Sequence, residues 1–179
     1  MTEWEPKIAA FFCNWCTYGA ADLAGVSRLQ YPPNFRVIRV PCSGRITPKF
    51  ILYAFRQGLD GVWISGCHPG DCHYIEGNYY ARRKFALLKN LLEHTGIHPD
   101  RLQFSWISSA ESTKFARVAR EVVDSVRQLG PIPGRTRLRL YVGTAAVTTL
   151  MGIMSREQLM PGEADALINE DTIYWDLKE

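Results

Sequence analysis

Three apolar, strand-like runs that each end at a cysteine constrain this chain most strongly. They span residues 7–13, 35–42 and 61–67 and end at Cys13, Cys42 and Cys67. Cys16 and Cys72 follow closely after the first and third runs. If the runs form neighbouring parallel strands, their carboxyl ends open onto one crevice, where open α/β sheets usually bind ligands. We therefore expect all five sulfurs near one point, an arrangement that suggests a bound metal centre.

The remaining pattern alternates strands with helices. Helices are expected at residues 20–29, from Pro48 to the stop at Gly58, at residues 80–95, and from Ser108 or Ser109 to Gly130, with a fourth strand at residues 101–107. Such alternation predicts an α/β fold with an open, mostly parallel, doubly wound (flavodoxin-like) sheet. The cysteine loops are then expected at the carboxyl-terminal ends of the strands.

The sequence divides into two parts. Residues 1–130 form the predicted α/β iron-sulfur domain, and residues 131–179 form a carboxyl-terminal extension that begins with a Pro/Gly linker. The extension contains an alternating stretch at residues 137–142 and an apolar stretch at residues 145–154. We interpret the extension as a possible partner-docking segment.

Composition and charge exclude several classes of function. The 179 residues are 46% hydrophobic, and the net charge of +3 gives no reason to expect nucleic acid as a partner. The amino terminus lacks the features of a signal peptide, and no apolar run approaches the length of a membrane span. The sequence thus predicts a cytoplasmic protein that does not bind membranes. In that reducing compartment a disulfide framework is the least favoured use of five cysteines.

The chemistry is concentrated in three loops. Residues 13–16 form a C-x-x-C directly after a strand, and residues 66–73 form a Gly/Pro-containing loop with two cysteines and two histidines. Residues 41–45 add Cys42 and one nearby cation, Arg45. Thiolates in this number select iron-sulfur clusters or zinc, and both centres take four ligands. One of the five cysteines is therefore left over.

Cys13 and Cys16 are the first choice as ligands, completed by two of Cys42, Cys67 and Cys72. Four other side chains are expected to surround the centre: Arg45, His68, His73 and Trp15. The histidines are expected as polar neighbours more than as ligands, because enough thiolates are present. No nucleotide-binding or hydrolytic motif occurs, so no catalytic residue is predicted.

Two other uses of the cysteines remain open at this point. A structural zinc in a binding or scaffold module would need C-x-x-C and two further cysteines. A thioredoxin-like dithiol would use Cys13 and Cys16 alone and would leave the other three cysteines unexplained.

The loops also carry a family resemblance. The segments 11–22, 39–45 and 66–74, together with residues 79–83, resemble the delta subunit family of methyl-viologen-reducing hydrogenase, from about Lys7 to Gly130. The resemblance implies a non-catalytic electron-transfer subunit that carries one 2Fe-2S cluster. Its implied partners are the A-type flavoprotein of heterodisulfide reductase, which belongs to electron-bifurcating complexes, and a hydrogenase, formate dehydrogenase or other electron-donating oxidoreductase. The extension lies outside this resemblance.

Overall fold

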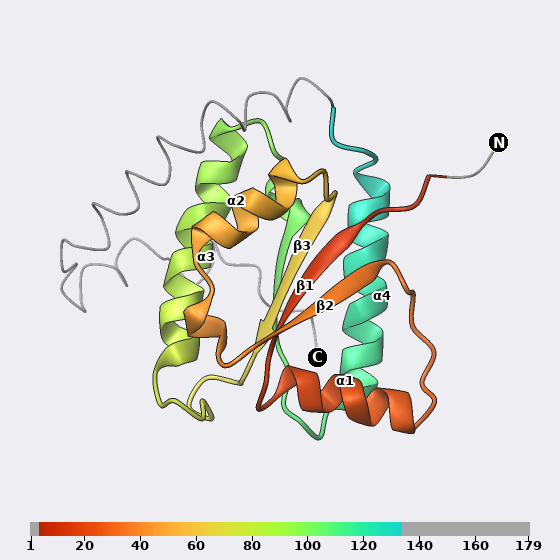
Figure 1. The fold of residues 1–179 in the computed structure, drawn as a ribbon, viewed down its shortest axis with the longest axis vertical. Coiled ribbons are helices and arrows are strands. Elements are labelled where there is room, and N and C mark those ends of the chain that lie inside the picture. Colours follow the sequence, from red (N-terminus) through yellow and green to blue (C-terminus); the bar gives the residue numbers. More distant parts are fainter. Residues whose placement is uncertain (1–3, 134–179) are drawn as a thin grey trace.

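Four parallel strands form the centre of the fold in the computed structural model, which describes residues 4–133 (Figure 1). The elements are β1 (Ile8–Cys13), α1 (Thr17–Val26), β2 (Phe35–Val40), the 3-10 turn η1 (Ser43–Arg45), α2 (Pro48–Arg56), β3 (Gly61–Gly66), α3 (Gly77–His94), η2 (Pro99–Arg101), β4 (Leu102–Trp106) and α4 (Ser112–Gln128). The predicted α/β class with an open parallel sheet is confirmed.

The strand order determines where a ligand can sit. The order is β2-β1-β3-β4, which is the beginning of the flavodoxin-like order. The chain winds outward in one direction from β1 to β2 and in the other from β1 to β3 and β4, so the order reverses beside β1. Cys13 lies level with Val40 of β2, and Phe12 lies level with Ser65 of β3. The loops after these three strands therefore open at one edge of the sheet, at the reversal point.

Helices cover both faces of the sheet (Figure 1). Residues of α2 and α3 pack on one face around Phe11, Ile64 and Phe104. Residues of α1 and α4 pack on the other around Phe12, Trp63 and Phe115. The ring centroids of Phe12 and Trp63 are 4.7 Å apart, edge to face. The central strands β1 and β3 are buried along their whole length, which explains why their sequences are apolar without alternation.

Two helices begin earlier than the sequence predicts. Helix α1 starts at Thr17 and not at residue 20, and α3 starts at Gly77 and not at Tyr80. Both starts carry a glycine and polar residues, which are poor helix signals. Tertiary contacts with the cysteine loops fix these first turns.

The part of the extension that the structure describes ends at Pro133. Ile132 is 5% exposed and packs into the core on the α2 and α3 face. The expected stretches at residues 137–142 and 145–154 lie outside the described residues. Among residues 4–133, no helix is both long and apolar enough to cross a membrane.

Candidate metal centre

All five cysteines meet at the carboxyl ends of β1, β2 and β3. Cys13 ends β1, Cys16 precedes α1, Cys42 precedes η1, and Cys67 and Cys72 lie in the loop between β3 and α3. None of the five forms a disulfide. Four are 8% exposed or less and form one buried cluster, and Cys16 packs against that cluster from a half-buried position. The structure therefore brings together the sulfurs that are expected near one point from the sequence.

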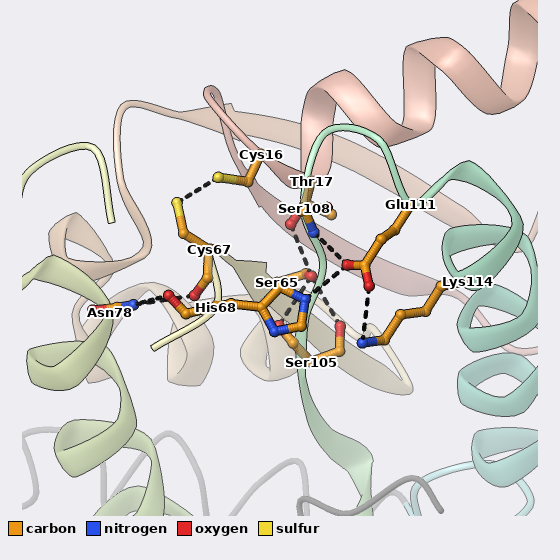
Figure 2. Close-up of polar contacts among 10 residues, drawn as sticks. All are labelled: Cys16, Thr17, Ser65, Cys67, His68, Asn78, Ser105, Ser108, Glu111 and Lys114. Atoms are coloured by element: carbon orange, nitrogen blue, oxygen red, sulfur yellow. Dashed lines mark hydrogen bonds and ion pairs between the residues drawn. The ribbon is translucent and has the colours of Figure 1, made fainter. Parts of the chain in front are cut away.

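The five sulfurs fall into two groups. In the first group, the Sγ atoms of Cys13, Cys16 and Cys67 all lie within 4.8 Å of one another. The Cys13 and Cys67 sulfurs are 3.7 Å apart. The Cys16 and Cys67 sulfurs are 2.6 Å apart, and Figure 2 shows this second pair. In the second group, the Cys42 and Cys72 sulfurs are 3.9 Å apart.

These spacings fit a tetrahedral thiolate site. A tetrahedral metal with metal–sulfur bonds of about 2.3 Å holds its sulfurs about 3.8 Å apart. The Cys13/Cys67 and Cys42/Cys72 pairs stand close to that separation. The Cys16/Cys67 spacing is shorter than such an edge but longer than the roughly 2.05 Å of a disulfide. The donor set and two of its spacings thus suit an iron-sulfur centre or zinc.

The environment disfavours the thiolate form of three cysteines, Cys13, Cys16 and Cys42. The hydrogen bond with Cys67, together with burial, raises the pKa of Cys13 well above its ordinary range. Burial also raises the pKa of Cys16 and of Cys42. A reactive dithiol needs a lowered thiol pKa, so this environment is the opposite of what thioredoxin-like chemistry by Cys13 and Cys16 requires. A bound cation would reverse the balance by stabilising thiolates.

The first turn of α3 forms one wall of the sulfur cluster. A Cβ atom added to Gly77 would overlap the Sγ atom of Cys42, so only glycine allows this approach. A Cβ atom on Gly44 would lie 2.6 Å from the carbonyl oxygen of Gly77. The cysteine-bearing turn η1 and helix α3 are therefore packed backbone against backbone.

Asn78 fixes the loop that carries Cys67. The Asn78 side chain is fully buried, and its Nδ2 donates to the carbonyl oxygens of Cys67 at 3.2 Å and of His68 at 2.7 Å (Figure 2). Its Oδ1 accepts from the backbone N–H of Tyr79. One amide thus joins the end of β3 to the start of α3 and orients the backbone on which Cys67 sits.

Lys84 is a half-buried cation near Cys42. Its Nζ donates to the carbonyl oxygen of Gly44 at 2.8 Å, two residues after Cys42 in the chain. Burial lowers the pKa of Lys84, and the charge of the neighbouring Cys42 raises it in part. Arg45, the cation expected from the sequence, is exposed on η1.

His68 points away from the sulfurs toward α4. Its Nε2 is 2.7 Å from Oε2 of Glu111, which also accepts from the Ser108 backbone N–H at 2.7 Å (Figure 2). Burial alone would raise the pKa of Glu111, but these hydrogen bonds and Lys114 lower it to about 2. His68 therefore ties the cysteine loop to the start of α4.

Buried hydroxyls lie beneath this link. Thr17 Oγ1 donates to Ser65 Oγ at 2.9 Å, and Ser105 Oγ donates to the same atom at 2.9 Å. Figure 2 shows this chain of hydroxyls between the start of α1 and the strands. It explains why α1 begins at Thr17, because a buried threonine hydroxyl needs this partner.

Trp15 and His73 form an exposed cover beside the cluster. Their rings stack with centroids 3.8 Å apart, and Trp15 Nε1 donates to Tyr74 Oη at 3.3 Å. Of the four side chains expected around the centre, His68, His73 and Trp15 belong to the cysteine loops and make these contacts.

Sequence reasoning missed four residues of the site: Gly77, Asn78, Lys84 and Glu111. Gly77 and Asn78 precede the expected start of their helix, although a glycine followed by a buried asparagine amide at a helix start is a usable signal of close packing. Lys84 lies far along the chain from Cys42, and Glu111 lies far along the chain from His68, the loop residue that it contacts. Neither carries a local motif that could have placed it.

Comparison with known proteins identifies relatives of the chain. Residues 8–130 match the family model described as methyl-viologen-reducing hydrogenase, delta subunit. The chain is 55% identical over 129 residues to the iron-sulfur D-type subunit of the F420-non-reducing hydrogenase vhc of Methanococcus voltae, which covers 72% of this chain and 90% of that protein. It is 56% identical over 129 residues to the corresponding iron-sulfur protein of the F420-non-reducing hydrogenase of Archaeoglobus profundus, covering 72% of this chain and 94% of that protein. It is also 45% identical over 139 residues to the A-type subunit of the ferredoxin:CoB-CoM heterodisulfide reductase of Methanosarcina mazei, covering 78% of this chain but 17% of that longer protein.

Proposed function

The chain belongs to the delta subunit family of methyl-viologen-reducing hydrogenase, and from this membership we propose that it is an electron-transfer subunit carrying one 2Fe-2S cluster. It relays electrons between a hydrogenase, formate dehydrogenase or other oxidoreductase and the flavin subunit of a cytoplasmic heterodisulfide reductase-type complex. Any electron bifurcation would occur at that flavin subunit. This chain would carry single electrons and would make or break no bond in a substrate.

The observation that carries the proposal is the pairing of sulfurs at two tetrahedral spacings. A 2Fe-2S cluster takes two thiolates on each iron, four in all. The Cys13/Cys67 pair at 3.7 Å and the Cys42/Cys72 pair at 3.9 Å match that requirement. A single zinc would need only one group of four around one point, so two separate pairs favour the two-metal centre.

We propose that these two pairs are the ligands and that Cys16 is the fifth cysteine. The Cys16 sulfur lies 2.6 Å from that of Cys67, too close for both to occupy one tetrahedron without moving apart. Cys16 is also the least buried of the five. From this position Cys16 can donate a hydrogen bond to the Cys67 ligand, which would tune the reduction potential of the centre.

The position of the site suits an electron relay. The sulfurs lie near the surface at the end of a sheet that is packed on both faces, so the centre is held rigidly while a partner approaches it. The similarity to a stretch of the A-type heterodisulfide reductase protein supports the proposed partner. In that relative a similar domain is part of the same chain as the rest of the protein, so contact between the two is physically feasible.

The proposal is tested by the metal content and spectrum of the anaerobically purified full chain. We expect about two irons and two acid-labile sulfides per chain, and visible absorption that bleaches on reduction with dithionite. A colourless chain with one zinc would contradict the proposal and favour the structural module.

Serine substitutions at each cysteine test the ligand assignment. We expect Cys13→Ser, Cys42→Ser, Cys67→Ser and Cys72→Ser to lose iron or to shift the spectrum. Cys16→Ser should keep two irons and change only the reduction potential. Loss of the cluster in Cys16→Ser, with retention in one of the others, would overturn this choice of ligands while leaving the electron-transfer role intact.

A further inference from the structure

An exposed and strained isoleucine projects from the loop that carries Cys72. Ile75 has a φ of +66°, in the left-handed region that β-branched residues rarely adopt. Its side chain is 79% exposed. The turn is held by the Ile75 N–H, which donates to the Cys72 carbonyl at 2.8 Å, and by the Glu76 N–H, which donates to the Tyr74 carbonyl at 2.8 Å. The backbone thus holds Ile75 outward through hydrogen bonds that begin at a cysteine of the site.

Folding explains neither property of Ile75. Glycine would adopt the same φ without steric cost. An apolar side chain that stays in water gains nothing from the hydrophobic effect. A strained residue that also displays an apolar group points to a role outside the folded chain, because such strain is kept where function uses it.

The surroundings of Ile75 are already ordered. Trp15 stacks on His73 at 3.8 Å and donates to Tyr74 at 3.3 Å, so three exposed rings on two loops are locked together. We call Trp15, His73, Tyr74 and Ile75 the aromatic rim. Rigid aromatic side chains lose little conformational entropy on binding, and they are the residues that most often anchor interfaces.

The residues of the aromatic rim are exposed and adjoin two of the five cysteines in the chain. Trp15 immediately precedes Cys16, the half-buried cysteine, and Tyr74 and Ile75 follow Cys72. The thiols of Cys16 and Cys72 are themselves electrostatic neighbours. A protein that exchanges electrons with the centre by the shortest route would therefore contact this rim.

We propose that Ile75 and the aromatic rim form the docking surface for the electron-transfer partner, a flavoprotein with an apolar socket beside its redox centre. This inference rests on the proposed function. Ile75 enters the socket, and the rings of Trp15 and Tyr74 close over its edge and exclude water. The hydrogen-bonded turn holds Ile75 outward before binding, so the loop loses little conformational entropy when the partner binds.

Two variants and a matched control test this inference in the full, cluster-loaded chain. Ile75→Gly and Ile75→Asn remove the apolar group, and both residues tolerate a positive φ. Val26→Asn removes an aliphatic side chain that is 76% exposed at the far end of α1, away from the rim. The probe is the A-type heterodisulfide reductase flavoprotein from the same organism, with its affinity measured by biolayer interferometry and electron transfer to its flavin by stopped flow.

We expect both Ile75 variants to keep the iron content, the visible spectrum and the rate of reduction by reduced methyl viologen, a small electron donor that needs no docking. Their thermal midpoint should be unchanged or higher, because strain is removed. Their affinity for the flavoprotein should fall at least about tenfold, whereas Val26→Asn should bind as the wild type does.

Three results would overturn the inference. Unchanged affinity in both Ile75 variants would remove the docking role but leave the proposed function in place. Loss of iron in both variants would make Ile75 a structural residue. Self-association of the wild-type chain that disappears in Ile75→Gly would assign the rim to a second copy of the chain. A wild-type chain that does not bind the flavoprotein under any condition would show that the proposed partner is wrong. That result concerns the proposed function and can be distinguished from the three results above.

Discussion

The two ends of the sheet are built in opposite ways. At the amino ends of the strands, Arg101 is 4% exposed and donates to the carbonyl oxygens of Asp60, Leu129 and Gly130 at 2.7–3.0 Å. The Asp60 carboxylate accepts from the Lys7 N–H at 3.1 Å. At the carboxyl ends, five thiols face mainly one another. The first end is held by hydrogen bonds within the chain, whereas the second is a cluster of thiols of the kind that binds a metal centre.

The difference shows that stability and function are located separately in this fold. At the closed end, which is the end that carries Arg101, one guanidinium joins η2, the start of β3 and the end of α4. The open end, which carries the cysteines, contains thiols with raised pKa values, a glycine in close contact with a sulfur, and an isoleucine with a strained backbone. Substitutions at the two ends should therefore have separable effects on unfolding and on the metal centre.

The largest effect on stability is expected at the closed end. Arg101→Ala leaves three carbonyl oxygens without their donor, and we expect a loss of about 3–5 kcal/mol in the free energy of unfolding. Urea denaturation measures this loss, and the iron content per folded chain should not change. The stability of Arg101→Lys should lie between those of the wild type and Arg101→Ala, because an ammonium group cannot make all the hydrogen bonds of a guanidinium. An equal loss of iron and of stability in Arg101→Ala would show that the two ends are not independent.

A smaller loss of stability with a larger loss of iron is expected at the open end. In Gly77→Ala the new methyl group overlaps Cys42 Sγ, so the sulfur must move out of its pairing with Cys72. We expect a cost of about 1–3 kcal/mol from overpacking and a sharply reduced iron content, measured by colorimetric assay. Gly25→Ala is the control, because its Cβ meets nothing within 4 Å and alanine is preferred in a helix. Full iron content in Gly77→Ala would contradict the role of this wall.

The smallest effect is expected at the link between the open end and α4. Glu111→Gln removes the charge that accepts from Ser108 and His68, and we expect a loss of about 1 kcal/mol at pH 7, since the carboxylate is partly exposed. Because the pKa of Glu111 is lowered from 4.5 to about 2, its stabilisation is fully present above pH 4.5 and is lost as the pH falls toward 2.

Urea unfolding of the metal-free chain at several pH values measures this prediction. The difference in free energy of unfolding between the wild type and Glu111→Gln should become smaller below pH 4.5. Glu93→Gln, at an exposed position on α3, should show no such change. A difference that stays constant between pH 7 and pH 3 would mean that the charge of Glu111 does not stabilise the fold.

The strands and the meeting of the cysteines can be predicted from the sequence because both depend on local patterns. Buried strands appear as apolar runs, and the carboxyl ends of parallel strands share one edge. The pairing of Cys42 with Cys72 and of Cys13 with Cys67 depends on how the loops bend, which no spacing in the chain records. Arg45 is expected near the sulfurs because it follows Cys42 closely in the chain, whereas Lys84, a second cation near Cys42, comes from α3 and has no such signal. A contact between residues that are distant in the chain has no local sequence pattern that would predict it.

The places where the described residues enter and leave the fold have a consequence for access to the cysteines. The described chain begins beside β1 and leaves after α4 at the same end of the sheet, where Glu5 and Arg127 form an ion pair at 3.0 Å (Figure 1). The cysteine loops lie at the opposite end. A partner protein that approaches the cysteine loops would therefore not meet the residues at which the described part of the chain enters and leaves the fold.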